Sequence, residues 1–264
     1  MSELQRFRLP FVVQLAITIS VISVGMTAAS MYVFYSSSQA IIMQQMRDRL
    51  KGIGQTGAYL LTDRDRDYLK YLKQVGEQET TPDTLQKIRD LSMGDSAQGF
   101  SAEVSQRYMR SQPFQQVVQA LRKINQASRK RIEPLNDAIP QTPNDLQADP
   151  YLSLSYIYTS IPKAPQPHVY RCLASSLPDP NPPWMGNPYG TLYYPPVPTE
   201  FARALQGETV TSQDFYTDDW GTWLSAFVPL KDRDGSVIAI LGVDLDISGP
   251  ANQLKQLRII CISI

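Results

Sequence analysis

The sequence has few residues of the kinds that build disulfide frameworks, zinc sites and thiol-based active sites. It contains two cysteines, Cys172 and Cys261, and one histidine, His168, in 264 residues. Two cysteines are too few for a disulfide framework. One histidine with these cysteines does not favour a zinc site or a Cys/His catalytic pair. We therefore expect no metal and no cofactor, and no catalytic pair of cysteine and histidine.

The chain also lacks an excess of either charge. Its 25 Lys and Arg residues balance 25 Asp and Glu residues. A basic surface is what draws a protein to nucleic acid, and nothing in this balance indicates one. We expect no nucleic-acid partner.

Charged residues are missing from one long stretch near the N-terminus, Phe11 to Tyr35. About 20 apolar residues cross the hydrocarbon core of a bilayer. Arg6 and Arg8 precede the stretch, which predicts a cytoplasmic segment 1–10 by the positive-inside rule and a transmembrane helix 11–35. A cleaved signal peptide that uses Thr27-Ala28-Ala29 is the alternative.

The other end of the chain is apolar too. Residues 257–264 read LRIICISI, which we interpret as the start of a second transmembrane helix that the end of the chain truncates. The alternative is a frayed strand or helix at the end of a soluble domain. On the first interpretation, residues 36–256 form an extracytoplasmic domain between two membrane segments.

Helices dominate the first half of this domain. Past Ser38, apolar residues recur at steps of three and four, the spacing of a helix seam: Met43, Met46, Leu50, Ile53, Gly57 and Leu60. This seam predicts a homodimer through the N-terminal helix, or packing of the helix on its own domain. Further helices are expected to start after Thr62 and to cover 83–91 and 113–128.

Strands are expected in the second half, at 152–160, 168–176, 222–230 and 236–247. A proline-dense segment, Pro178 to Pro198, is expected to hold no regular element. The order predicts an α+β fold, in which a transmembrane helix continues into long helices that pack on an antiparallel sheet of about five strands.

The last two strands form the most informative stretch. Lys231-Asp232-Arg233-Asp234-Gly235 predicts the turn of a hairpin. The second strand is apolar on both faces except for Asp244 and Asp246, so it is expected in the middle of a sheet that is covered on both sides. Carboxylates at the end of such a strand need partners.

These residues carry a resemblance to a known family. The run Asp218-Asp219-Trp220-Gly221-Thr222-Trp223-Leu224-Ser225-Ala226, followed by Pro229-Leu230, Asp234-Gly235 and Leu241-Gly242-Val243-Asp244, resembles the Cache family. Members are PAS-like extracytoplasmic sensor domains of bacterial receptors. The resemblance covers roughly Met43 to Ser248 in element order and Tyr156 to Ser248 in recognisable motif.

The resemblance implies that the domain binds a small molecule without catalysis. Binding would move the flanking membrane helices in the bacterial plasma membrane. The output would be a cytoplasmic histidine kinase of a two-component system, a nucleotide cyclase or a phosphatase, which this chain does not contain.

Ligand residues are implied in the same way. In the amino-acid-binding branch of the family, a Tyr-x-Asp before the hairpin and an Asp late in its second strand hold the ligand ammonium. Tyr216-Thr217-Asp218 and Asp244 stand at the matching places. The Trp184 to Tyr194 loop has aromatic residues but no arginine for a carboxylate, so an amine fits better than an amino acid. The full candidate set is Asp244, Asp218, Tyr216, Trp184, Tyr189, Tyr156, Tyr158, Tyr170 and Trp223.

Each candidate also has a structural interpretation. Asp244 would bind backbone donors at a strand end, Asp218 would form a turn, and Trp223 and the tyrosines would pack in the core. Two other functions stay open: a membrane-anchored periplasmic hydrolase that uses Asp residues, and a structural coiled-coil anchor.

Overall fold

The computed structural model describes residues 10–128, 153–178 and 187–246. They divide into two units, 10–46 and 47–246, which we describe separately. The first unit is the beginning of helix α1 (Phe11–Leu60). The predicted cytoplasmic residues 1–9 and the predicted second membrane segment, 257–264, lie outside the described residues.

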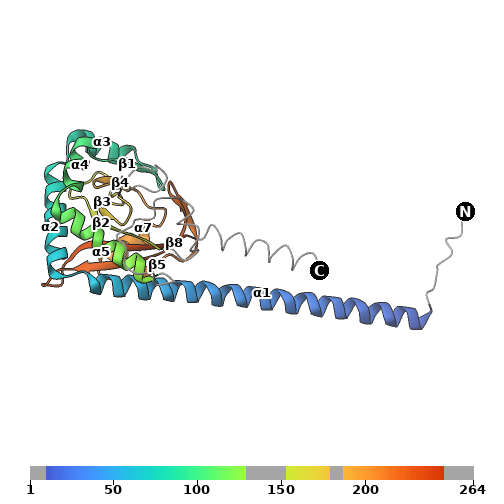
Figure 1. Cartoon of the computed structure of the whole chain (residues 1–264). Helices are drawn as coiled ribbons and strands as arrows, with labels where there is room; N and C mark the ends of the chain where they lie inside the picture. The colour runs from blue at the N-terminus through green and yellow to red at the C-terminus, as the bar shows by residue number, and fades with distance from the viewer. Residues whose placement is uncertain (1–9, 129–152, 179–186, 247–264) are drawn as a thin grey trace, which may run out of the picture. The chain divides into compact units, whose positions relative to one another are not determined.

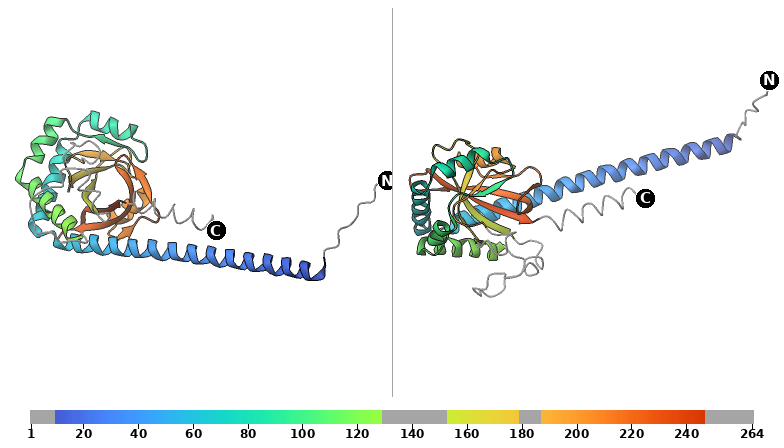
Figure 2. Two further views of the ribbon diagram at one scale, coloured as in Figure 1. Left: turned by 45° about the vertical axis from the view of Figure 1, so that its right-hand side comes forward. Right: turned by 90° about the horizontal axis from the view of Figure 1, so that it is seen from above.

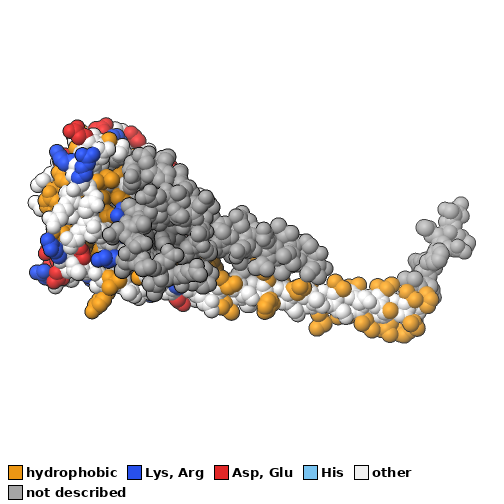
Figure 3. Space-filling view, in the orientation of Figure 1, with side chains coloured by type: hydrophobic (Ala, Val, Ile, Leu, Met, Phe, Trp, Pro, Cys, Tyr) orange, Lys and Arg blue, Asp and Glu red, His pale blue; other side chains and the backbone are white. Residues whose placement is uncertain are grey.

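Helix α1 is the one helix, in the part of the chain that the structure describes, with the length and composition to cross a membrane. Large apolar side chains are exposed along it, from Phe11 to Val33, and Figure 3 shows them as a row of hydrophobic atoms. An exposed apolar row of this length is characteristic of a helix in lipid, and a signal sequence has the same composition.

The second unit contains five further described helices. They are α2 (Asp63–Gln78), α3 (Pro82–Asp90), α4 (Ala102–Met109), α5 (Gln112–Ser128) and α7 (Pro198–Leu205). Thr62 caps α2 as the sequence predicts, because its hydroxyl accepts from the Asp65 N–H at 3.2 Å and the Asp65 carboxylate accepts from Thr62 N–H at 2.9 Å. Helices α3 and α5 match their predicted ranges closely, whereas α4 was not predicted.

The sheet is antiparallel and has eight strands, not about five. They are β1 (Ser96–Gln98), β2 (Ser153–Ser160), β3 (Tyr170–Ser175), β4 (Thr191–Tyr193), β5 (Val210–Thr211), β6 (Tyr216–Asp218), β7 (Gly221–Lys231) and β8 (Val237–Asp246). The order is β1-β4-β3-β2-β8-β7-β5, and β6 also pairs with β7. The expectation of no regular element in Pro178–Pro198 was wrong, since β4 occupies three residues there that contain no proline.

Strands β7 and β8 form the predicted hairpin. Gly235 takes φ 85° in the turn and donates its N–H to the Asp232 carbonyl at 3.0 Å, a backbone conformation that favours glycine. Strand β8 pairs with β7 on one side and with β2 on the other. It is therefore central, and all of its residues from Ile238 to Leu245 are buried.

The sheet is curved and carries helices on both faces (Figures 1 and 2). Helices α2 and α5 and the Arg47–Leu60 part of α1 pack on one face, which we call the helix face. Helix α7 packs on the other, where its Phe201 ring lies 4.5 Å from the Phe227 ring. We call this second face the α7 face. Both layers together bury the central strands from solvent.

The seam of α1 is used in part by the chain itself. Leu50, Gly54 and Gly57 are buried, and a side chain at Gly54 would contact Val228 of β7. Of these three, Leu50 and Gly57 belong to the predicted seam, and their burial supports the interpretation that the helix packs on its own domain. The homodimer stays a prediction, and Leu50, which is 1% exposed, is not available to a second copy.

Candidate functional site

Asp244 is the central polar group of the α7 face. It lies on β8, opposite Ser225 of β7 and Leu154 of β2, and is 5% exposed. The Tyr156 hydroxyl donates to Asp244 Oδ1 at 2.7 Å, and the Ser225 side chain is a second hydrogen-bond partner. Among the described residues, Asp244 is thus held by side-chain hydroxyls from the two neighbouring strands, and no backbone donor binds its carboxylate.

Gly242 makes the contact between Tyr156 and Asp244 possible. Tyr156 pairs with Gly242 across β2 and β8, and its ring lies where a Cβ on Gly242 would be. The ring therefore crosses β8 directly over the glycine, and its hydroxyl reaches the residue two places further along the strand. A side chain at 242 would close this path.

The environment of Asp244 favours its protonated form. The pKa of this carboxyl is raised to about 8: burial is the largest cause and the nearby Asp218 carboxylate adds to the rise, while the hydrogen bonds from Ser225 and Tyr156 oppose it. No ion pair to Asp244 is present among the described residues. A buried acid without a cationic partner holds its proton near neutral pH.

Tyr216 joins this group through Ser225. The Tyr216 hydroxyl and Ser225 Oγ are 2.6 Å apart, so Ser225 contacts both Tyr216 and Asp244. Burial and the charges of Asp244 and Asp218 raise the pKa of Tyr216 well above its ordinary value. The phenol therefore remains a hydrogen-bond donor at physiological pH.

Asp218 is nearby but is occupied by the protein itself. Its Oδ1 accepts from Trp220 N–H at 3.0 Å, Gly221 N–H at 3.2 Å and Trp223 Nε1 at 2.9 Å. Its Oδ2 accepts from the Tyr193 hydroxyl at 2.6 Å. Four donors close the β6–β7 turn around this carboxylate, although burial raises its pKa. This geometry is that of the turn-forming interpretation, and it also fixes Trp223.

Tyr158 and Tyr170 belong to an aromatic cluster beside Asp244. The Tyr158 ring lies 5.2 Å from Tyr156, 5.5 Å from Tyr193 and 6.0 Å from Phe201. Tyr170 lies 4.9 Å from Phe201. The structure thus brings together seven of the nine candidates on the α7 face: Asp244, Asp218, Tyr216, Tyr156, Tyr158, Tyr170 and Trp223.

The other two candidates are not part of this group. The Tyr189 hydroxyl donates to the Leu72 carbonyl of α2 at 2.6 Å, and its ring packs against Phe114 of α5 at 6.2 Å. Tyr189 therefore lies on the helix face, because the chain turns between Asn187 and Thr191. Trp184 lies outside the described residues.

Three residues of the site were missed as candidates: Ser225, Tyr193 and Asn187. Ser225 could have been found, because it is a polar residue in a buried strand on the same side as Trp223. Tyr193 and Asn187 come from the proline-dense segment, where no periodicity indicates which way a side chain points.

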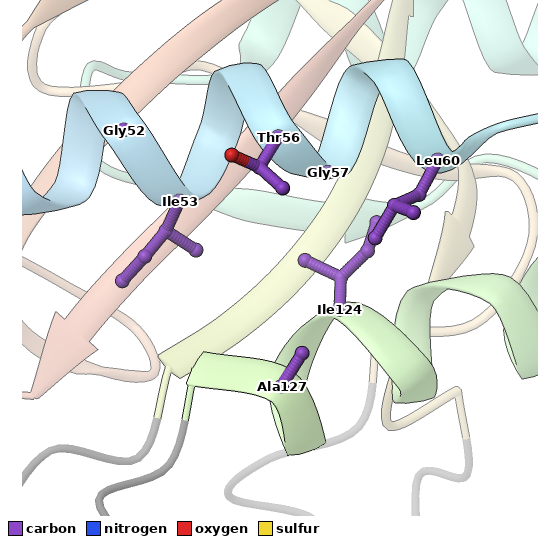
Figure 4. A pocket seen from close by; sticks show the side chains of 7 residues that line it. All are labelled: Gly52, Ile53, Thr56, Gly57, Leu60, Ile124 and Ala127. Carbon is purple, nitrogen blue, oxygen red and sulfur yellow. The ribbon is translucent and has the colours of Figure 1, made fainter.

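A groove of about 230 Å³ lies elsewhere, between α1 and α5. Its walls are small or apolar and include Gly52, Thr56 and Ile124 (Figure 4). It contains no charged side chain, so it offers no polar chemistry comparable to that around Asp244.

The residues that the structure describes contain no group of three or more His, Cys, Asp or Glu side chains that could hold a metal ion. Comparison with protein-family models, with curated proteins and with solved structures found no match. The function must therefore be inferred from the geometry of the α7 face.

Proposed function

We propose that the chain is the ligand-sensing part of a bacterial receptor in the plasma membrane, with an extracytoplasmic, PAS-like domain of the Cache type. The observation that carries the proposal is Asp244. It is a carboxyl buried at the centre of the sheet, protonated near neutral pH, and held by hydroxyls instead of a cation. A protein retains such a costly group where it has a use.

The proposed ligand is a small primary amine. An ammonium group beside Asp244 would supply the missing cation and would favour ionised Asp244, so that binding would release the proton from the carboxyl. The tyrosines around the site would surround the cation with aromatic faces and hydroxyl oxygens. A carboxylate ligand would add a third acid next to Asp218 and Asp244.

The connections of the site support a role in signalling. Asp244 lies two residues before the end of β8 at Asp246, and the chain continues from there towards the predicted second membrane segment. On the helix face, β7 and β8 support α1, the helix with the apolar N-terminal stretch. We propose that a ligand displaces β8 and that both membrane segments carry this movement to a cytoplasmic output domain outside this chain.

The hydrolase alternative receives less support from the site. Acid–base hydrolysis needs one carboxylic acid and one free carboxylate at the substrate. Asp218, the second acid, already accepts four hydrogen bonds from the protein. This favours a binding role over a catalytic one.

The proposal can be tested on the full chain in detergent micelles by thermal unfolding with primary amines, amino acids and carboxylates. We expect a saturable rise in Tm with an amine, which Asp244→Asn abolishes. Asp246→Asn is the matched control, since Asp246 is exposed and lies on the same strand. Turnover of a compound, or an equal rise in Tm with both variants, would contradict the proposal.

A further inference from the structure

The α7 face carries a second polar pair in addition to Asp244. Asn187 is 7% exposed, and its Nδ2 donates to the Tyr158 hydroxyl at 2.6 Å. Its Oδ1 has no hydrogen-bond partner among the described residues. A buried amide oxygen without a donor destabilises the folded protein, so each such group needs a reason.

The position of Asn187 is fixed by its backbone. Its N–H donates to the Leu177 carbonyl at 3.2 Å, and its carbonyl accepts from Cys172 Sγ at 3.7 Å. The side chain is thereby held against Tyr158, which is 1% exposed. Asn187 is therefore fixed beside β3 and β2, and its unpaired oxygen has a defined position.

Tyr158 supplies the complementary group. Its oxygen accepts the hydrogen bond from Asn187, which leaves its O–H to donate. Burial keeps this phenol protonated by raising its pKa well above the ordinary value. Together the pair presents one acceptor, Asn187 Oδ1, and one donor, the Tyr158 O–H. A hydroxyl or a carboxamide matches both, because each can donate and accept.

The pair shares its face with Asp244. Along β8, Asp244 is opposite Leu154 and Ile240 is opposite Tyr158, a separation of about 13 Å for four strand residues. The Tyr156 ring lies between these positions, 5.2 Å from the Tyr158 ring. A small molecule bound on this face would have Asp244 at one end of the aromatic cluster and the Asn187–Tyr158 pair at the other.

We infer that Asn187 and Tyr158 form a second subsite, and that the ligand is an amine whose far end carries a hydroxyl or carboxamide. This inference rests on the function proposed above. It adds a specificity that Asp244 alone would not give, since Asp244 would accept any primary amine of suitable size.

The test is isothermal titration of the full chain in detergent micelles with two series of probes, straight-chain ω-amino alcohols and the n-alkylamines of the same length. At the best length, we expect the amino alcohol to bind at least about tenfold more tightly, because a site built around a hydroxyl discriminates against an analogue that lacks it. Asn187→Leu, whose side chain has the same branching and the same number of heavy atoms, should weaken amino-alcohol binding more than alkylamine binding and so remove the preference.

Tyr158→Phe provides the second variant and should reduce the preference in the same direction. Thermal unfolding of both variants checks that each is folded. Equal affinity for the two series in the unmodified chain would overturn the subsite but not the amine sensor. A preference that both folded variants retain would also overturn the subsite but not the amine sensor. If neither series binds, both proposals are overturned.

Discussion

The surroundings of Asp244 determine its protonation state. An acid in the middle of a sheet loses its hydration, and the protein returns only two hydroxyl hydrogen bonds and a second acid nearby. The neutral form is the one that such surroundings stabilise. The pH dependence of stability therefore reports on this residue.

Between about pH 4 and pH 8 we expect stability to fall as pH rises. The folded state keeps the Asp244 proton up to a pKa of about 8, whereas the unfolded chain loses it near 3.9. The unfolded state thus binds fewer protons in this window, and the free energy of unfolding decreases by up to about 1.4 kcal/mol per pH unit. Urea unfolding followed by tryptophan fluorescence measures this slope.

Asp244→Asn is the control for this slope, because an amide imitates the neutral acid and does not titrate. The variant should lose most of the dependence and keep a smaller one, to which Asp218 contributes because burial also raises its pKa. A slope identical to that of the unmodified chain would show that Asp244 is not the titrating group.

Tyr156→Phe tests the hydroxyl that holds Asp244. Its hydrogen bond lowers the pKa of the carboxyl, so its removal should raise that pKa further and cost about 1 kcal/mol of stability. Tyr189→Phe is the matched control on the helix face, since it also loses one buried hydroxyl bond. Equal shifts of the pH-dependent window in both variants would contradict the contact.

At the scale of elements, the packing of α1 on the sheet depends on glycine. A Cβ at Gly54 would lie 2.7 Å from Val228 Cγ2, whereas a Cβ at Gly52 would have nothing within 4 Å. The two positions are close in one helix and differ in what they contact. Substitutions at Gly52 and Gly54 can therefore be compared to test how closely α1 approaches the sheet.

Gly52→Ala should stabilise the domain by about 0.5–1 kcal/mol, the helix-propensity difference. Gly54→Ala gains the same propensity but forces Val228 to move, which costs about 1–3 kcal/mol and gives a net loss. Urea unfolding of both variants provides the comparison. A similar gain from both substitutions would mean that α1 does not pack on β7 at Gly54.

The longer elements could be predicted because each is long enough to show a periodic pattern of apolar residues. Helix α5, strands β2 and β3 and the β7–β8 hairpin have apolar faces of the right period. Strands β1, β4, β5 and β6 have three residues or fewer. Such strands are too short to show an alternation of apolar and polar residues. Pairing across the sheet creates these strands, and β1 pairs with β4, which is distant in sequence, so no local pattern predicts that pairing.

The site was predictable to a similar degree. Asp244 was identifiable as a carboxylate in an otherwise apolar strand, and Tyr156 and Tyr158 as candidates on one face of their own strand. The turn-forming role of Asp218 was one of the two interpretations, but its four donors could not be predicted, since three of them depend on the geometry of the β6–β7 turn. The position of Tyr189 on the helix face could not be predicted, because the direction of a side chain in a proline-rich loop follows from packing.

At the scale of the whole molecule, the apolar part of α1 is the predicted membrane anchor. Val21→Arg in its middle should weaken membrane insertion by about 2.5–3.5 kcal/mol. Ser38→Arg, beyond the apolar stretch, should leave insertion unchanged. Extraction of bacterial membranes with alkaline carbonate measures the difference, and equal release of both variants would contradict a membrane-spanning helix.

The central claim is that Asp244 binds the ligand ammonium and gives up its proton. It is tested most directly by isothermal titration of an amine that binds, at pH 6.5, in phosphate and in imidazole buffers, which differ in ionisation enthalpy and contain no primary amine. We predict that about one proton is released per amine bound by the unmodified chain, and that Asp244→Asn binds the amine weakly or not at all. Binding without proton release, or undiminished binding by Asp244→Asn, would contradict the claim.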